Sequence, residues 1–276
     1  VSFDDTVLLL NFDGSNGATT TTDGSNFTSN QVITFSGTSE ISTSQNKFGG
    51  SSLKLTTDGF VTVADRPELD LTYQDFTVEW WEYRTSTSGN PTAIARNNAT
   101  FSPYIIGKAV SGRNKAFITH DGTSYSASEG LDIDMGSIDL NQWNHFALSR
   151  KGGSFRSFKN GVVVSTVDRP DLFVRVSSDS LQIGKGQGGK FFEGFIDGTF
   201  SNDNNAAKLD EEERMFNTVV NIEVLGYLIG GSENENATIE RKVESLVEVK
   251  IPRERVIIGD SFERDNKTGT DPFYKE

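Results

Sequence analysis

Short runs of β-forming residues, each closed by a Gly, Asn or Asp turn signal, follow one another through the first 200 residues. The strongest run is Asp75–Tyr83, in which Trp80 and Trp81 must point to opposite faces because side chains alternate along a strand. Asn160-Gly161 separates two further runs and suits a type I′ turn, whose central residues both need positive φ. Strands with turns at this spacing predict an all-β sandwich rather than a βαβ fold.

The expected strands are identified by an alternating or continuous apolar pattern between turn residues. Their ranges are Thr6–Phe12, Gln31–Phe35, Ser52–Leu55, Phe60–Val63, Asp75–Tyr83, Tyr104–Ile106, Lys115–Thr119, Ser124–Ala127, Asn144–Arg150, Ser154–Lys159, Val162–Thr166, Leu181–Gly184 and Phe192–Asp197. Asp121-Gly122 is expected to join two of these strands as a short hairpin. The segment from Glu129 to Asp134 lies beside Gly130 and Gly136 and is expected to be a loop.

Composition excludes several classes of chemistry. The chain has no cysteine and two histidines, His120 and His145, which excludes disulfides and cysteine zinc sites and argues against a two-histidine metal site. The formal net charge is −13 and the first 200 residues show no clustered Lys and Arg, so we expect no nucleic-acid partner. No run approaches the roughly 18 apolar residues of a membrane span, so we expect no membrane partner.

The sequence changes character after about residue 200. Residues 201–216 are polar and charged and are expected to form a linker with a short helix. Residues 217–276 contain β-rich runs that predict a long β-hairpin followed by an extended tail. Because a hairpin and tail of this length cannot bury a hydrophobic core alone, the segment is expected to pack on another protein or on a copy of itself.

Six segments of the first 200 residues occur in an order that resembles a known family. They are Thr6-Val-Leu-Leu-Leu-Asn-Phe-Asp-Gly14, Ser44-Gln-Asn-Lys-Phe-Gly-Gly-Ser-Ser-Leu53, Asp75-Phe-Thr-Val-Glu-Trp-Trp81, Gln142-Trp-Asn-His-Phe-Ala-Leu-Ser-Arg150, Asn160-Gly161 and Phe192-Glu-Gly-Phe-Ile-Asp197. In this order they resemble the laminin-G-like, concanavalin A-like jelly rolls of tailed-phage virion proteins and bacterial surface proteins. The resemblance implies a jelly-roll β-sandwich over residues 1–200 that binds a ligand and is not an enzyme.

The end of this region departs from the family pattern. Family members usually continue from Ile-Asp into Glu-x-x-Ile and a final strand, whereas this chain continues as Gly198-Thr199-Phe200. The last strand is therefore expected to be altered or to come from the next segment. The runs Phe216–Gly230 and Val247–Asp260 resemble the end of a neck or tail-completion structural protein of contractile-tailed phages. That resemblance implies an extracellular virion, at its tail or neck, with other virion proteins and copies of this chain as partners.

The resemblance also implies a candidate metal site. Jelly rolls of this class often hold one structural calcium ion between a carboxylate on the last strand and the turn after the first strand. Asp197 matches the late position, and Asp13 and Gly14 match the early turn. Calcium prefers carboxylate and backbone carbonyl oxygens, which such a turn offers. The alternative is that Asp13 makes an Asx-turn and Asp197 ends a strand without metal.

Catalytic arrangements are incomplete in the sequence. Glucanases of this fold need Glu-x-Asp-x-x-Glu on one strand, and the nearest match, Asp132-Ile-Asp134 after Glu129, lacks the second glutamate. His145 lies in an expected strand and His120 precedes a turn, so neither suits a Ser-His-Asp triad.

A binding function fits the aromatic residues better, because an aromatic face stacks on a sugar ring while polar groups contact the hydroxyls. One of Trp80 and Trp81, together with Tyr83, is a candidate for an outer face, and Tyr104 and Tyr125 are candidates near loops. The sequence therefore predicts a virion protein whose lectin-like sandwich binds cell-surface glycans, made effective by many symmetric copies. A purely structural decoration and a polysaccharide hydrolase are the alternatives.

Overall fold

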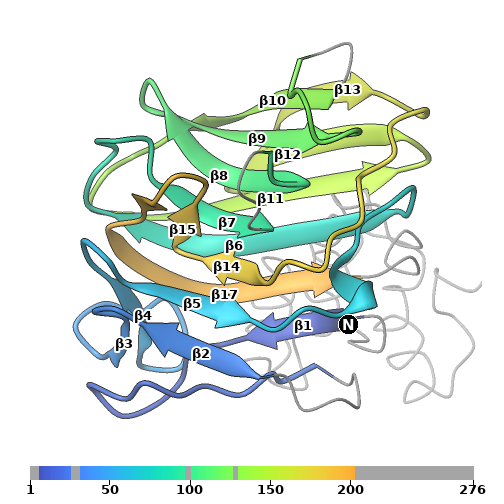
Figure 1. Ribbon diagram of the computed structural model, residues 1–276. Helices are drawn as coiled ribbons and strands as arrows, with labels where there is room; N and C mark the ends of the chain where they lie inside the picture. Colours follow the sequence, from blue (N-terminus) through green and yellow to red (C-terminus); the bar gives the residue numbers. More distant parts are fainter. Residues whose placement is uncertain (1–5, 26–31, 97–100, 127–129, 203–276) are drawn as a thin grey trace, which may run out of the picture. The chain divides into compact units, whose positions relative to one another are not determined.

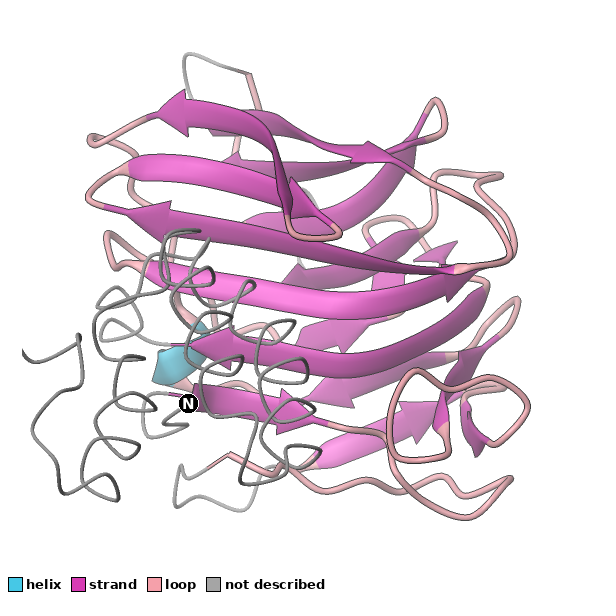
Figure 2. Cartoon of the chain, turned by 180° about the vertical axis from the view of Figure 1, so that it is seen from behind, coloured by secondary structure: helices cyan, strands magenta, loops and turns pink. Residues whose placement is uncertain are grey.

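Two antiparallel sheets lie face to face and enclose an apolar core in the computed structural model, which confirms the predicted all-β jelly-roll sandwich (Figures 1 and 2). The structure describes residues 6–25, 32–96, 101–126 and 130–202. The chain divides into two units, Val1–Lys208 and Leu209–Glu276, and only the first contains described residues. The hairpin and tail predicted at 217–276 lie outside the described residues, as does the linker beyond residue 202. Within the described ranges, no helix is long and apolar enough to cross a membrane.

The first sheet contains eight strands among the described residues. They are β1 (Thr6–Leu10), β3 (Glu40–Ser42), β4 (Ser52–Leu55), β6 (Phe76–Arg84), β11 (Trp143–Lys151), β12 (Ser154–Lys159), β13 (Val162–Asp168) and β17 (Gly194–Asn202). The order across the sheet is β13-β12-β11-β6-β17-β4-β3, and β1 also pairs with β17. β6 therefore lies near the middle, between β11 and β17 (Figure 1).

The second sheet contains seven strands in the part of the chain that the structure describes. They are β2 (Ile33–Ser36), β5 (Phe60–Val63), β7 (Thr92–Arg96), β8 (Tyr104–Val110), β9 (Arg113–Thr119), β10 (Gly130–Ser137) and β14 (Leu181–Ile183). The order is β10-β9-β8-β7-β14-β5-β2. A small hairpin of β15 (Lys185–Gly186) and β16 (Lys190–Phe191) and a 3₁₀ turn η1 (Pro67–Leu69) complete the described elements.

The alternation along β6 decides which side chains face the core. Trp80 is fully buried and stacks on Phe146 of β11, with ring centroids 5.8 Å apart. Trp81 is half-buried on the opposite, outer face of the first sheet. This confirms the expectation that the two tryptophans face opposite ways, because successive side chains of a strand alternate.

The turn between β12 and β13 also agrees with the sequence. Asn160 and Gly161 both adopt positive φ, at 48° and 82°. These are the left-handed conformations that a type I′ turn requires at its two central positions. The Asn160 side chain accepts a hydrogen bond from the backbone N–H of His145, which ties the turn to the neighbouring strand.

The loop predicted from Glu129 to Asp134 is wrong, because residues 130–137 form strand β10. Gly136 has a φ of +106° at a register shift in the pairing with β9, so it marks a bulge rather than a loop. Gly130 is needed for a different reason: a Cβ there would lie 2.2 Å from the carbonyl oxygen of Ile118. Both glycines therefore serve a strand, which their local sequence did not indicate.

Three further differences concern short elements. The strand predicted at Ser124–Ala127 is absent from the described residues 124–126, and β9 pairs with β10 instead. Asp121-Gly122 thus lies in a longer connection and does not close a tight hairpin. β3 and β7 were not expected, because three residues give too short a pattern and Thr92–Arg96 shows no alternation.

The last strand of the sandwich comes from the chain itself and is not supplied by a later segment. β17 runs from Gly194 through the unusual Gly198-Thr199-Phe200 sequence to Asn202. It pairs with β6 on one side, and there its register shifts between Asp197 and Phe200. On the other side it pairs with β1, where Thr6 lies opposite Asn202. The departure from the family pattern is therefore a bulged strand.

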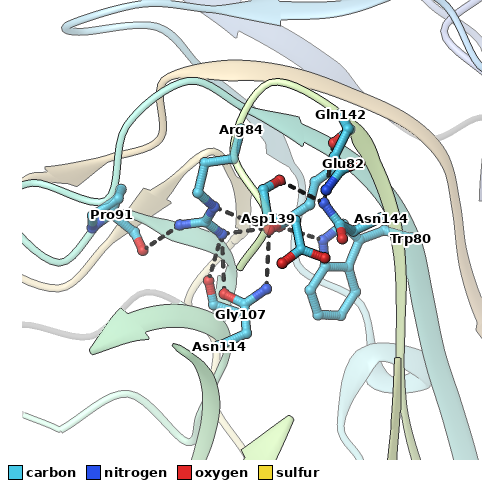
Figure 3. Close-up of polar contacts among 9 residues, drawn as sticks. All are labelled: Trp80, Glu82, Arg84, Pro91, Gly107, Asn114, Asp139, Gln142 and Asn144. Atoms are coloured by element: carbon cyan, nitrogen blue, oxygen red, sulfur yellow. Dashed lines mark hydrogen bonds and ion pairs between the residues drawn. The ribbon is translucent and has the colours of Figure 1, made fainter. Parts of the chain in front are cut away.

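A buried ion pair lies between the two sheets at one end of the core (Figure 3). Glu82 and Arg84 of β6 follow Trp80 on the core-facing side, and both side chains are fully buried. The Arg84 guanidinium donates from Nε and Nη2 to the Glu82 carboxylate at 3.0 and 2.9 Å. The Trp80 indole and the Asn114 amide donate to the same carboxylate, each at 3.0 Å.

The second sheet takes part in this network. Arg84 donates to the backbone carbonyls of Pro91 and Gly107 at 3.1 and 3.0 Å, and to the Asn114 carbonyl oxygen at 3.2 Å. Each buried charge therefore has a charged partner and further hydrogen bonds, which is the condition under which burial is tolerated. The guanidinium binds the two sheets together at this end.

Removing one partner of this pair should be strongly destabilising. We expect Arg84→Met to lower the free energy of unfolding by about 3–5 kcal/mol, because Glu82 would stay buried without its counter-charge. The matched control is Lys54→Met, which breaks the more exposed pair with Glu40 and should cost about 0–1 kcal/mol. Urea unfolding followed by tryptophan fluorescence reports on the sandwich alone, because all three tryptophans lie in it. Equal losses in the two variants would contradict this account of the core.

Candidate functional site

The outer face of the first sheet carries a row of aromatic rings across three adjacent strands. Trp143 of β11 and Phe195 of β17 lie directly opposite Tyr83 of β6, one on each side. The ring centroids are 5.8 Å apart for Trp143 and Tyr83 and 5.9 Å apart for Tyr83 and Phe195. All three side chains are half-buried, so part of each ring faces outward.

A second row of side chains lies beside the first and is centred on Trp81, two residues before Tyr83 on β6. Trp81 has His145 opposite on β11, with ring centroids 5.1 Å apart, and Asp197 opposite on β17. Phe48, from the loop before β4, packs edge-on against Trp81 at 5.9 Å, and the Lys47 ammonium lies 4.0 Å from the centroid of the Trp81 ring. We call Trp81, Tyr83, Trp143 and Phe195 the aromatic band.

Asp197 fixes the loop that covers the Trp81 end of the band. Its Oδ2 accepts hydrogen bonds from the backbone N–H groups of Lys47 and Phe48 at 2.8 and 2.9 Å. Its Oδ1 is buried and has no hydrogen-bond partner. One carboxylate thus positions the two loop residues whose side chains contact Trp81.

Asp13 lies close to this carboxylate. Burial raises the pKa of the Asp197 carboxyl to about 6, and the negative charge of Asp13 adds to the rise, against the lowering effect of backbone hydrogen bonds from Phe48, Lys47 and Gly198. A Cβ at Gly49, whose φ is +59°, would lie 1.7 Å from the Asp13 Oδ1, so only glycine lets the loop approach this carboxylate. Gly14 is tied to the same loop, because its N–H donates to the Ser51 hydroxyl at 2.9 Å.

The three residues proposed from the sequence as metal ligands, Asp13, Gly14 and Asp197, therefore all border the loop of residues 47–51. Among the described residues, no group of three or more His, Asp or Glu side chains converges to hold a metal. A cation here would take two carboxylates and fill its remaining positions with backbone carbonyls and water, a donor set that suits calcium. The unpartnered, buried Asp197 oxygen beside a second carboxylate fits such an ion.

The carboxylates considered for hydrolysis are occupied by ion pairs. Asp132 and Asp134 project from β10, where Lys115 contacts Asp132 at 2.9 Å and the Arg113 Nε contacts Asp134 at 2.9 Å. The hydrogen bond from Arg113 lowers the pKa of Asp134, which is opposite to what a general acid needs. Glu129 lies outside the described residues.

The two histidines also have ordinary surroundings. His145 is packed on Trp81, and its Nε2 lies 3.4 Å from a Glu79 carboxylate oxygen. His120 is exposed in a bend after β9, with its Nδ1 3.3 Å from the carbonyl oxygen of Phe173.

The loop-adjacent tyrosines proposed from the sequence lie elsewhere. Tyr104 is buried in the core and its hydroxyl donates to the Leu69 carbonyl, so its proposed role at a sugar-binding surface is wrong. Tyr125 is half-buried against the second sheet, bonded to the Ser102 carbonyl. Sequence reasoning missed Phe195 and Phe48, since only the pairing of β17 with β6 and the Asp197 contact place them beside Tyr83 and Trp81.

Comparisons with solved structures show the same fold at low sequence identity. The binding domain of Paraclostridial Mosquitocidal Protein 1 matches with a TM-score of 0.61 and 14% identity, over 79% of this chain and 53% of that one. The binding domain of Botulinum Neurotoxin DC in complex with SialylT matches with a TM-score of 0.56 and 16% identity, over 78% and 51%. This chain thus spans about half the length of these toxin domains.

A smaller domain is matched over most of its length. Domain 4 of AbnA, an extracellular arabinanase from Geobacillus stearothermophilus in complex with arabinotriose, has a TM-score of 0.52 and 18% identity, over 72% of this chain and 93% of that one. No curated protein matches the sequence significantly. Residues 55–199 match the family model described as the concanavalin A-like lectin/glucanases superfamily. With that match spanning more than half of the chain, on a jelly-roll sandwich of two antiparallel sheets, the protein belongs to the concanavalin A-like lectin/glucanase superfamily.

Proposed function

We propose that the sandwich is a lectin-like module that binds glycans through the aromatic band. The observation that carries this proposal is the in-register row of Trp143, Tyr83 and Phe195 on an outer face of the first sheet. Half-exposed rings in a row offer apolar faces to successive sugar rings. His145, Glu79 and Lys47 border the same band and supply polar groups that can contact sugar hydroxyls.

The structural neighbours support the same class of ligand. The binding domain of Botulinum Neurotoxin DC is in complex with SialylT, and the arabinanase domain is in complex with arabinotriose. The same toxin's binding domain is also found in complex with rat synaptotagmin II, so the fold also serves protein receptors. The ion pairs of Asp132 and Asp134 make hydrolysis the weaker alternative for this chain.

We also propose that Asp197, Asp13 and a carbonyl of the Gly14 turn hold one structural calcium ion. The ion would neutralise two neighbouring carboxylates and satisfy the buried Asp197 oxygen. Since Asp197 also holds the loop carrying Lys47 and Phe48, calcium would stabilise the loop that borders the aromatic band.

For the whole chain, we propose the tail or neck of a phage virion as its location, with the segment after residue 200 joining other virion proteins or further copies. The support is the resemblance of the residues after 216 to a neck or tail-completion protein. Many copies on one particle would convert weak glycan contacts into stable attachment. The test is the structure of the native particle: contacts from residues 217–260 to neighbouring chains support the proposal, and a free monomer contradicts it.

Aromatic substitution should weaken glycan binding without unfolding the sandwich. We expect the double variant Tyr83→Leu/Trp143→Ala to bind about thirtyfold more weakly than wild type, because each of the two ring contacts contributes about 1 kcal/mol. Binding is measured on a glycan array that includes arabino-oligosaccharides and sialylated glycans. The control Tyr73→Leu removes a ring that is 59% exposed outside the band. Unchanged binding by the double variant on the glycans that wild type prefers would exclude the band as the site.

Calcium should stabilise the folded protein through Asp197. We expect millimolar calcium to raise the midpoint of thermal unfolding at pH 7 by about 5 °C or more, since an ion that binds only the folded state adds its binding free energy to stability. The variant Asp197→Asn should lose this shift, whereas Asp132→Asn, which removes an equal charge from the second sheet, should retain it. Differential scanning fluorimetry in chelator and in calcium gives both values. A full calcium response in Asp197→Asn would contradict the site.

Without a divalent cation, Asp197 should make stability depend on pH. Its pKa of about 6 in the folded protein lies above the ordinary value of 3.8, so between these values the folded state holds the proton more tightly. Wild type, relative to Asp197→Asn, should therefore gain roughly 2 kcal/mol of unfolding free energy as the pH falls from 7 to 4. Urea unfolding in chelator measures this difference, and a loss of relative stability on acidification would be the wrong sign.

A further inference from the structure

A bulge in β8 turns a lysine onto the outer face of the second sheet. Ile106 faces the core, and the register of β8 against β9 shifts between Ile106 and Lys108. Gly107, with a φ of +74°, also faces inward, because a Cβ there would lie 2.5 Å from the Trp80 ring. With two successive residues directed to the core, Lys108 is directed outward instead of continuing the alternation.

Lys108 lies among like charges. Lys115 of β9 is directly opposite it, and Lys190 of the β15–β16 hairpin is close enough to lower its pKa further, after the larger effect of burial. The hairpin lies against β7, the strand on the other side of Lys108 (Figure 1). Half-buried ammonium groups that repel one another are unfavourable unless an anion accompanies them.

The protein leaves most of this charge unneutralised. Lys115 is paired with Asp132, but no carboxylate among the described residues forms an ion pair with Lys108, Lys185 or Lys190. The chain carries 39 acidic and 26 basic residues, so acidic groups are plentiful. We call Lys108, Lys115 and Lys190 the lysine cluster.

An aromatic ring lies beside these lysines, and the hairpin packs next to them. The Lys108 ammonium is 5.5 Å from the Phe117 ring centroid, and that of Lys115 is 5.9 Å from the same centroid. Thr92 lies opposite Lys108 on β7, and Gly186 of the hairpin packs over Thr92, because a Cβ at Gly186 would lie 2.3 Å from the Thr92 Oγ1. Lys190 is the strand partner of Gly186, which places it near Lys108.

We propose that the lysine cluster is a second binding site, for a glycan that carries carboxylate or sulfate groups. An anionic group would lie between Lys108 and Lys190, and a sugar ring would pack near Phe117. Two or three cations beside an aromatic ring suit a sparsely charged sugar chain better than a nucleic acid, whose dense phosphates a protein of net charge −13 would repel. This site lies on the opposite sheet from the aromatic band and does not depend on it.

The experiment compares polygalacturonic acid with its methyl ester, which has the same sugar rings without the charges. The full chain is used for affinity electrophoresis through gels that contain either polymer. We expect wild type to be retarded by the acid form alone, and less as salt is added. Lys108→Gln/Lys190→Gln should bind at least tenfold more weakly. Lys151→Gln, which removes one exposed charge from the first sheet, should bind like wild type.

Three outcomes would overturn the proposal. They are equal binding of the acid and its ester, unchanged binding by the double lysine variant, and retardation by poly-glutamate but not by the polyuronate, which would indicate an acidic-peptide site. Tyr83→Leu/Trp143→Ala is run in the same gels and should bind the acid polymer normally. Loss of binding to the acid polymer in that variant alone would assign acidic glycans to the aromatic band and contradict the lysine site. A negative result of the glycan-array test of the aromatic band would not affect the test of the lysine cluster.

Discussion

The ion pair of Glu82 and Arg84 fixes how the two sheets meet. One guanidinium bonds to a carboxylate of its own strand and to backbone carbonyls of Pro91 and Gly107 beside the second sheet. Because a hydrogen bond constrains the position of the carbonyl that accepts it, the bond from Arg84 stabilises the backbone bulge at Gly107. The same bulge turns Lys108 outward. A polar contact inside the core therefore reaches the bulge that directs Lys108 to the surface.

The two outer faces differ in chemistry although they enclose one core. The first sheet presents aromatic rings on its central strands, bordered by a loop held by the Asp197 carboxylate. The second presents ammonium groups that lie near the rings of Phe117 and Phe60. Because strand residues alternate, outward positions can change without disturbing the inward ones, which lets one fold carry different surfaces.

The sequence predicted the structure correctly wherever a residue pattern is compatible with a single type of local structure. Alternation around Trp80 and Trp81 predicted the central strand, and Asn160-Gly161 predicted a turn with two positive φ values. The sequence did not predict the structure where glycine can serve more than one purpose. Gly130 and Gly136 indicated a loop, yet within β10 Gly130 allows close packing against the Ile118 carbonyl oxygen and Gly136 forms a bulge. The aromatic band could be half predicted, since Tyr83 and Trp81 share a strand. Phe195 and Phe48 join them only through pairings between distant parts of the chain.

Pairing of the first strand with the last has a consequence for how the chain folds. Among the described strands, β1 pairs with β17 alone, and the loop at Lys47 is held by a carboxylate 150 residues later. On a ribosome, the N-terminal third would leave the exit tunnel with an open sheet edge and an unattached loop. Neither can close until β17 has been made. Such distant contacts slow folding and leave strand edges exposed to other chains meanwhile. Closure of the sandwich is thus a late, nearly all-or-none event, and a polypeptide that stops short of residue 194 lacks the strand on which that closure depends.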